Sequence, residues 1–130
     1  MQPRAVAVEG VAAPAGHYSH GLVVEASRWL FVAGQVPLDP DGQLVGPGDA
    51  EVQAEQVLLN LGRVVEAAGG ALSGVVKCTV YLVDLADRAA VGRARQRFFP
   101  HPPPTNTLVV VTSLAHPEFL VEIDAVVALS

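Results

Sequence analysis

The sequence predicts a single α+β domain in which two helices lie on one face of a mostly antiparallel sheet. Two observations carry this prediction. Apolar residues recur at helical spacing in only two segments, and short runs rich in β-branched residues precede, separate and follow them. A chain of 130 residues is also typical of one domain with its own core, so residues 1–130 are assigned to one domain.

The first part of the chain is predicted to form short strands. These strands are expected at residues 4–9, 22–24 and 29–33. A loop rich in small residues at 10–21 follows the first strand, and a hairpin turn at 25–28 joins the second to the third. The segment Asp39-Pro40-Asp41-Gly42 is a further turn, because proline fixes φ and glycine can take a positive φ.

The first helix is expected to begin near Asp49, because aspartate is a good N-cap. It ends at Gly69-Gly70, where glycine tolerates the left-handed C-cap conformation. Apolar residues at helical spacing form its buried stripe. The stripe consists of Ala54, Val57, Leu58, Leu61, Val65 and Ala68.

The second part of the chain is predicted to contain a strand, a helix and two further strands. The strand covers residues 75–83, and the helix covers 87–99 and ends at Pro100. The proline-rich stretch 101–104 must be extended. Two more strands follow, at 105–111 and 120–128, with His116-Pro117 in the turn between them.

Composition excludes several classes of protein. Hydrophobic residues make up 51% and charged residues 16%, which excludes intrinsic disorder. The net charge is −5 without a basic tract, so no nucleic-acid partner is expected. The single Cys excludes an internal disulfide and multi-Cys zinc sites, and agrees with a reducing cytoplasm, where we expect the protein. No apolar run approaches the roughly 18 residues of a membrane span.

Alternation along the strands predicts which side chains lie under the helices. The predicted helix-facing set is Val76, Cys78, Val80, Leu82, Thr107, Val109, Val111, Val121, Ile123, Ala125 and Val127. The opposite set is Lys77, Thr79, Tyr81, Asn106, Leu108, Val110, Glu122, Asp124 and Val126. This second face is too polar for a dry core and too apolar for open solvent. Symmetric association through it would cover it, although a one-sided sheet with a solvated face remains an alternative.

Several segments stand out when taken in order: Gly16-His17-Tyr18-Ser19-His20-Gly21, Val32-Ala33-Gly34-Gln35-Val36-Pro37, Val65 to Gly70, Val76 to Leu85, Arg97-Phe98-Phe99 with Pro104, and Val121 to Val126. In this order they resemble the segments of the Rid (YjgF) family of reactive intermediate deaminases. The resemblance covers nearly the whole chain. It implies a chorismate-mutase-like fold and a homotrimer with three clefts between subunits. Members with deaminase activity hydrolyse imines and enamines derived from amino acids to keto acids and ammonia.

The chain departs from this family at the position that holds the substrate carboxylate. The family's Arg corresponds here to Asn106, its Cys to Leu108 and an Asn of its second helix to Gly92. Asparagine is neutral and cannot replace the two parallel charged hydrogen bonds of arginine. We therefore expect a substrate less charged than a simple 2-imino acid. Tyr18 and Glu122 stand at their expected positions, as do Gly34 and Gln35.

The predicted catalytic residues are Glu122 and Tyr18. A carboxylate in a partly dry cleft can take a proton from water, although Glu122 could instead be an interface carboxylate paired with Lys77 or an arginine. The Tyr18 hydroxyl could donate to a developing oxyanion, or its ring could simply pack at a subunit contact.

The expected substrate-binding residues are Asn106, Leu108, Gly34, Ala33, His17 and Gly92. Asn106 could also be an ordinary strand residue without a ligand. His17 and His20 flank Tyr18, but no third ligand has suitable spacing, so neither a metal nor another cofactor is expected. Cys78 is expected to be a buried small hydrophobe.

Four arginines are expected to form a solvated surface of the second helix, although one of them, or Arg28, could replace the missing carboxylate-binding Arg. The four are Arg88, Arg93, Arg95 and Arg97. Two main functions follow: an enzyme of the imine-hydrolysing class with an altered substrate, or a non-catalytic ligand-binding trimer. A ribonuclease or translation inhibitor is the weakest alternative, because the chain lacks a basic patch.

Overall fold

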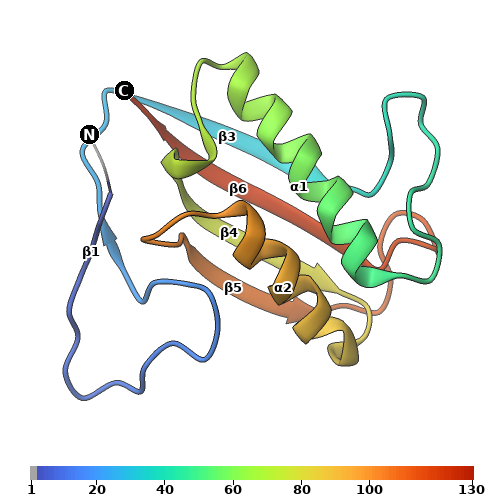
Figure 1. The fold of residues 1–130 in the computed structure, drawn as a ribbon, viewed down its shortest axis with the longest axis horizontal. Coiled ribbons are helices and arrows are strands. Elements are labelled where there is room, and N and C mark those ends of the chain that lie inside the picture. The colour runs from blue at the N-terminus through green and yellow to red at the C-terminus, as the bar shows by residue number, and fades with distance from the viewer. Residues whose placement is uncertain (1–2) are drawn as a thin grey trace.

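A computed structural model describes residues 3–130 and has two helices packed on one face of a four-stranded sheet (Figure 1). The strands lie in the order β3-β6-β4-β5. Their bounds are Arg28–Gln35 for β3, Val75–Leu82 for β4, Thr105–Val110 for β5 and Val121–Leu129 for β6. A separate two-stranded sheet joins β1 (Arg4–Ala5) to β2 (Leu22–Val23).

The main sheet is mostly antiparallel, as the sequence predicted, but one edge is a parallel pair. β6 pairs antiparallel with both β3 and β4, whereas β4 and β5 run parallel. A parallel pair needs a crossover connection, and helix α2 (Arg88–Phe98) supplies it. Figure 1 shows α2 lying over β4 and β5, and α1 lying beside it on the same face of the sheet.

Two predictions about the N-terminal part are wrong. The expected strand at 4–9 is only Arg4–Ala5. The expected hairpin at 25–28 does not form, because β2 pairs with β1 while β3 pairs with β6. The cause is long-range pairing that overrides a local turn signal: β6 offers β3 a full-length antiparallel partner in the main sheet.

Helix α1 (Ala50–Ala67) has the predicted N-cap and C-terminus. The Asp49 side chain accepts a hydrogen bond from the Val52 amide at 3.1 Å. At the other end Gly69 has a φ of +84°, and the amide of Gly70 bonds back to the Val65 carbonyl. The 3₁₀ turns Leu72–Gly74 and Leu85–Asp87 precede β4 and α2. Within residues 3–130 no helix is long and apolar enough to cross a membrane.

The hydrophobic core lies between the two helices and the sheet. The predicted stripe of α1 contributes to it, with Leu58, Leu61 and Val65 fully buried. The sheet contributes alternate residues of β4 and β6, such as Val80 and Ile123, which are also fully buried. The same alternation buries Cys78, as expected.

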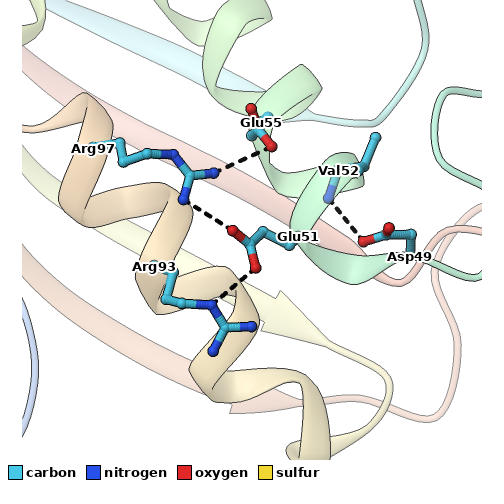
Figure 2. A network of polar contacts seen from close by, with 6 residues as sticks. All are labelled: Asp49, Glu51, Val52, Glu55, Arg93 and Arg97. Atoms are coloured by element: carbon cyan, nitrogen blue, oxygen red, sulfur yellow. Dashed lines mark hydrogen bonds and ion pairs between the residues drawn. The ribbon is translucent and has the colours of Figure 1, made fainter.

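Ion pairs join the exposed sides of the two helices (Figure 2). The Glu51 carboxylate of α1 accepts from Arg93 and from Arg97 of α2, each at 2.9 Å. Arg97 also reaches Glu55 at 3.2 Å. Arg97 first, and then Arg93, holds the pKa of Glu51 below its usual range. These contacts orient the two helices, although exposed pairs of this kind contribute little to stability.

The face assignment of β5 is also wrong. In the parallel register Asn106 lies opposite Cys78 and Leu108 lies opposite Val80, so both point toward the helices. Leu108 packs against the core, whereas Thr107 and Val109 are exposed on the other face. Alternation shows which residues of a strand share a face of the sheet, but it does not show whether that face lies under the helices. Neither side of β5 is apolar enough to identify the side that packs against the helices.

The sheet face that carries no helix, called the open face below, exposes large apolar side chains. Phe31 is 76% exposed and Trp29 is 46% exposed, both on β3. They lie beside Val126 and Ala128 of β6. An apolar area of this kind on a sheet face is typical of a contact surface.

We predict that Leu58→Ala lowers the free energy of unfolding by about 2–5 kcal/mol, because it leaves a cavity in the core under α1. Urea denaturation followed by circular dichroism measures the change. The matched control is Leu59→Ala, the next residue of the same helix, whose side chain is 46% exposed. It should change stability by less than about 1 kcal/mol. Equal losses in the two variants would contradict the assignment of the core.

Candidate functional site

A cleft of about 680 Å³ lies on the helix side of the sheet, where α2 crosses the edge formed by β4 and β5. Val80, Val91 and Leu108 give it an apolar surface. Its polar side chains come from α2, from β5 and from the segment 15–18. They are His17, Tyr18, Arg88, Arg95 and Asn106. No acidic residue is among the described residues that line it.

The segment with Tyr18 is attached to the connection between α2 and β5 by hydrogen bonds to backbone groups. Ser19 donates from its hydroxyl to the Pro103 carbonyl at 2.6 Å and from its amide to the Pro104 carbonyl at 3.1 Å. The His17 ring donates from Nε2 to the Phe99 carbonyl at 2.8 Å. These bonds hold the Tyr18 side of the cleft against the connection that leads into β5.

Five of the predicted site residues line this cleft. They are Tyr18, His17, Asn106, Leu108 and Gly92. Gly92 leaves open space, since a Cβ added there would meet no atom within 4 Å. The Oδ1 atom of Asn106 is buried and has no hydrogen-bond partner among residues 3–130. A buried acceptor without a partner is uncommon in folded proteins and indicates a group that a ligand can satisfy.

The remaining three, Glu122, Gly34 and Ala33, lie away from the cleft on the open face. The Glu122 carboxylate sits over Gly34, where a Cβ would be 2.7 Å from the carboxylate carbon. Ala33 and Gly34 belong to a bulge of β3, because Val32 pairs with Ala125 and Gln35 pairs with Ile123. Within one copy of the chain the sheet therefore separates Glu122 from Tyr18.

The Glu122 carboxylate is available for chemistry. Burial, and then the nearby Asp124, raise its pKa above the usual range. Within residues 3–130 no hydrogen bond or ion pair occupies it, and Lys77 donates to Thr79 instead. A carboxylate with a raised pKa and free oxygens can take a proton from water.

Asp124, the other acid of this face, is already engaged. It accepts from the Tyr81 hydroxyl at 3.1 Å and from the Thr79 amide at 3.2 Å. The hydrogen bond with Asp124 in turn raises the pKa of Tyr81. This acid therefore acts as a fixed negative neighbour of Glu122 rather than as a second base.

The two histidines near Tyr18 make local contacts. His17 bonds to Phe99 as described, and His20 donates from Nε2 to the Ala12 carbonyl at 2.6 Å. Among residues 3–130 there is no group of three His, Cys, Asp or Glu side chains that could hold a metal ion. Cys78 is completely buried, and burial raises the pKa of its thiol to about 12, so it is no nucleophile.

Sequence reasoning also misplaced Arg95. It was expected on a solvated surface, but it is only 4% exposed and lines the cleft. Its Nη1 donates to the His17 carbonyl at 3.0 Å, while Nε and Nη2 have no partner among the described residues. A signal for this was present, because Arg95 follows the buried Val91 by four residues and so shares its side of the helix.

Comparison with known proteins gives consistent matches. The sequence profile described as "Endoribonuclease L-PSP" matches residues 10–129. "Protein DfrA" of Myxococcus xanthus is 41% identical over 111 residues, which are 85% of this chain and 84% of that protein. The "2-iminobutanoate/2-iminopropanoate deaminase" of Mus musculus is 37% identical over 115 residues, or 88% of this chain and 84% of that protein.

A solved structure matches the whole fold. The crystal structure of YyfB from Yersinia pestis, a Rid-family protein described as being of unknown function, aligns with a TM-score of 0.91. The two chains are 33% identical, and the alignment covers 99% of this chain and 100% of that one. The predicted arrangement of two helices on a mostly antiparallel sheet is therefore confirmed.

We predict that Gly92→Ala raises the free energy of unfolding by about 0.5–1 kcal/mol, because alanine favours a helix and open space surrounds this position. The control is Gly69→Ala, which also has open space but a φ of +84°. It should lower stability by about 1–2 kcal/mol. Thermal and urea unfolding measure both. A loss of stability in Gly92→Ala would contradict the open space assigned to the cleft at this position.

Proposed function

This chain belongs to the Rid (YjgF) family, and on that premise we propose that it is an enzyme that hydrolyses an imine, an enamine or a related carbonyl intermediate. Relatives named as 2-iminobutanoate/2-iminopropanoate deaminases support this reaction class. The single observation that carries the proposal is the Glu122 carboxylate, partly buried, with a raised pKa and no partner among the described residues.

The proposed reaction adds water across a C=N bond. Glu122 takes a proton from water as the oxygen attacks the carbon, and protonation of the nitrogen gives a carbinolamine. The carbinolamine hydroxyl then gives up its proton as the C–N bond breaks, the nitrogen takes this second proton and leaves as ammonia, and a carbonyl compound remains. Tyr18 donates a hydrogen bond to the oxygen of the tetrahedral intermediate. Asn106 binds a polar group of the substrate through its unpartnered Oδ1.

The site that we propose is completed by a second copy of the chain. Glu122 and Gly34 lie on the open face, whereas Tyr18 and Asn106 line the cleft on the other side of the sheet. A closed homotrimer would bring the open face of one copy against the cleft of the next. The exposed Phe31 and Trp29 support association through this face.

A ribonuclease is the weaker reading, although the matching profile carries that word in its description. Binding of a phosphodiester chain needs several free cations. On α2 the exposed Arg93 and Arg97 are both paired with Glu51, and the net charge of the chain is −5. A small neutral or singly charged metabolite suits the cleft better than RNA.

We predict that Glu122→Gln lowers kcat/KM for imine hydrolysis by about 100-fold or more, because glutamine cannot accept the proton. The assay follows ammonia release from imines generated in situ, with 2-iminopropionate and an uncharged imine as the two substrates. Turnover that survives Glu122→Gln would overturn the role of Glu122. Binding of metabolites without any turnover in the wild-type protein would favour a non-catalytic ligand-binding trimer instead.

The pH profile tests the same role. The base must be ionised, and burial and Asp124 raise its pKa, so kcat/KM should fall as the pH drops through a value above that of an ordinary glutamate. Asp124→Asn removes the negative neighbour and should move this acid limb to lower pH. An acid limb that stays in place in Asp124→Asn would mean that a different group titrates.

We predict that light scattering finds a particle of three times the 13.5 kDa chain mass. Phe31→Glu places a charge on the open face and should yield single chains without imine hydrolysis, since each site would lack the neighbour's Glu122. The control is Leu59→Glu, on the exposed side of α1, which should leave the assembly intact. A wild-type protein that is monomeric at micromolar concentration would end the proposal of a shared site.

A further inference from the structure

Arg95 is a buried cation whose charge no side chain of residues 3–130 neutralises. Only 4% of its surface is exposed, and among the N and O atoms of residues 3–130 its one hydrogen-bond partner is the His17 carbonyl, which accepts from Nη1, while the Cys78 thiol lies beside the guanidinium. The guanidinium carbon lies 5.5 Å from the centre of the Phe99 ring. Within residues 3–130 no acidic side chain pairs with it, and burial lowers its pKa. A buried charge in this state is costly unless an anion binds to it.

The unpartnered atoms of Arg95 lie on one edge of the guanidinium. Nε and Nη2 carry parallel N–H groups there, and both lack a partner among the described residues. This edge matches the two oxygens of a carboxylate, with which it forms two parallel charged hydrogen bonds. The other end of the guanidinium is held by His17, so the free edge keeps a fixed direction.

A second unpartnered group lies close by on the sheet. Asn106 is opposite Cys78 in the register of β4 and β5, and the Arg95 guanidinium lies beside the Cys78 thiol. The Oδ1 atom of Asn106 is a buried acceptor without a partner in the described chain. Two unused donors and one unused acceptor therefore lie next to Cys78, and their side chains line the cleft together with the apolar Val80 and Leu108.

We infer that Arg95 and Asn106 together bind a small carboxylic acid that carries an N–H or O–H donor next to its carboxylate. Arg95 binds the carboxylate through Nε and Nη2, and Asn106 Oδ1 accepts from the donor. A fully ionised phosphate fits less well, because it offers no donor to Oδ1 and would lie against apolar side chains. Among the described residues, two arginines and no acid line the cleft of a chain with net charge −5, which also favours an anion.

This inference rests on the proposed function and refines its substrate. From Asn106 alone, the expected substrate was less charged than a 2-imino acid. Arg95, reaching the cleft from α2 rather than from β5, restores a positive charge, and an imine N–H next to a carboxylate satisfies Asn106. The chain thus retains a 2-imino acid as substrate while the carboxylate-binding residue comes from a different element.

The test is calorimetric binding of stable ligands that differ in one group. The wild-type protein should bind 2-hydroxybutanoate about tenfold to a hundredfold more tightly than 2-hydroxybutanamide, because only the first is charged. Arg95→Gln should remove this preference. Arg95→Lys should retain part of it, because lysine keeps the positive charge but lacks the two parallel N–H groups of the guanidinium. Arg93→Gln removes the same charge from the exposed side of the helix and should keep the full preference.

Asn106 has its own readout. The wild-type protein should prefer 2-hydroxybutanoate to butanoate, and Asn106→Leu should abolish that preference while the preference for carboxylate over amide stays. Circular dichroism establishes whether each variant is folded. If Arg95→Gln does not fold, the comparison of Arg95→Lys with the wild-type protein decides the question. An unchanged preference for carboxylate in Arg95→Lys and Arg95→Gln overturns the inference, as does equal binding of acid and amide by the wild-type protein.

One competing anion is the neighbour's Glu122. If the Glu122 carboxylate bound to Arg95 in the assembly, Glu122→Gln would tighten 2-hydroxybutanoate binding about tenfold, and that result would overturn the inference.

Failure of the proposed function and failure of this inference give different experimental results. Carboxylate binding through Arg95 without imine hydrolysis refutes only the function, whereas imine hydrolysis with an unchanged KM in Arg95→Gln refutes only the role of Arg95.

Discussion

The parallel pairing of β5 with β4 determines which side chains the cleft receives. Two contacts fix its register: the Thr105 hydroxyl donates to the Val76 carbonyl at 2.7 Å, and the Val111 amide donates to the Leu82 carbonyl at 2.8 Å. A slip of one residue would turn Asn106 and Leu108 to the open face. The apolar surface of the cleft and its unpartnered amide therefore both depend on the two ends of one short edge strand.

Helix α2 divides its arginines between two tasks because of its helical geometry. Residues four apart lie on the same side, so Arg93 and Arg97 both reach Glu51 of α1 (Figure 2). Arg95 lies two residues from each and is rotated by about 200° from them, which directs it to the cleft. The side of α2 that faces away from the ion pairs thus carries the buried guanidinium.

Much of the fold could be predicted from the sequence, because its signals are local and strong. Asp49 and Gly69 delimit α1, and periodic apolar residues define its buried stripe. Prediction failed where one local sequence pattern is compatible with two different structures. The alternation of β5 is the same on either face, and only pairing with β4 decides that Asn106 lies under the helices.

The site could be predicted only in part, because local sequence patterns identify chemical groups but not their positions in the fold. The residues with a chemical pattern, Tyr18 and Asn106, lie in the cleft, but spacing could not show that the sheet stands between them and Glu122. Arg95 was grouped with its exposed neighbours because charge is a poor guide to burial. What buries it is the segment with His17, which is far away in sequence and has no helical or strand pattern.

The attachment of that segment has a consequence for how the protein can vary. Ser19 and His17 are anchored to backbone carbonyls of residues 99 and 103, so their positions depend little on which side chains those residues carry. The preceding residues 7–14 are exposed and make few contacts. Sequence drift or insertion in that stretch can therefore accumulate without displacing Tyr18 from the cleft.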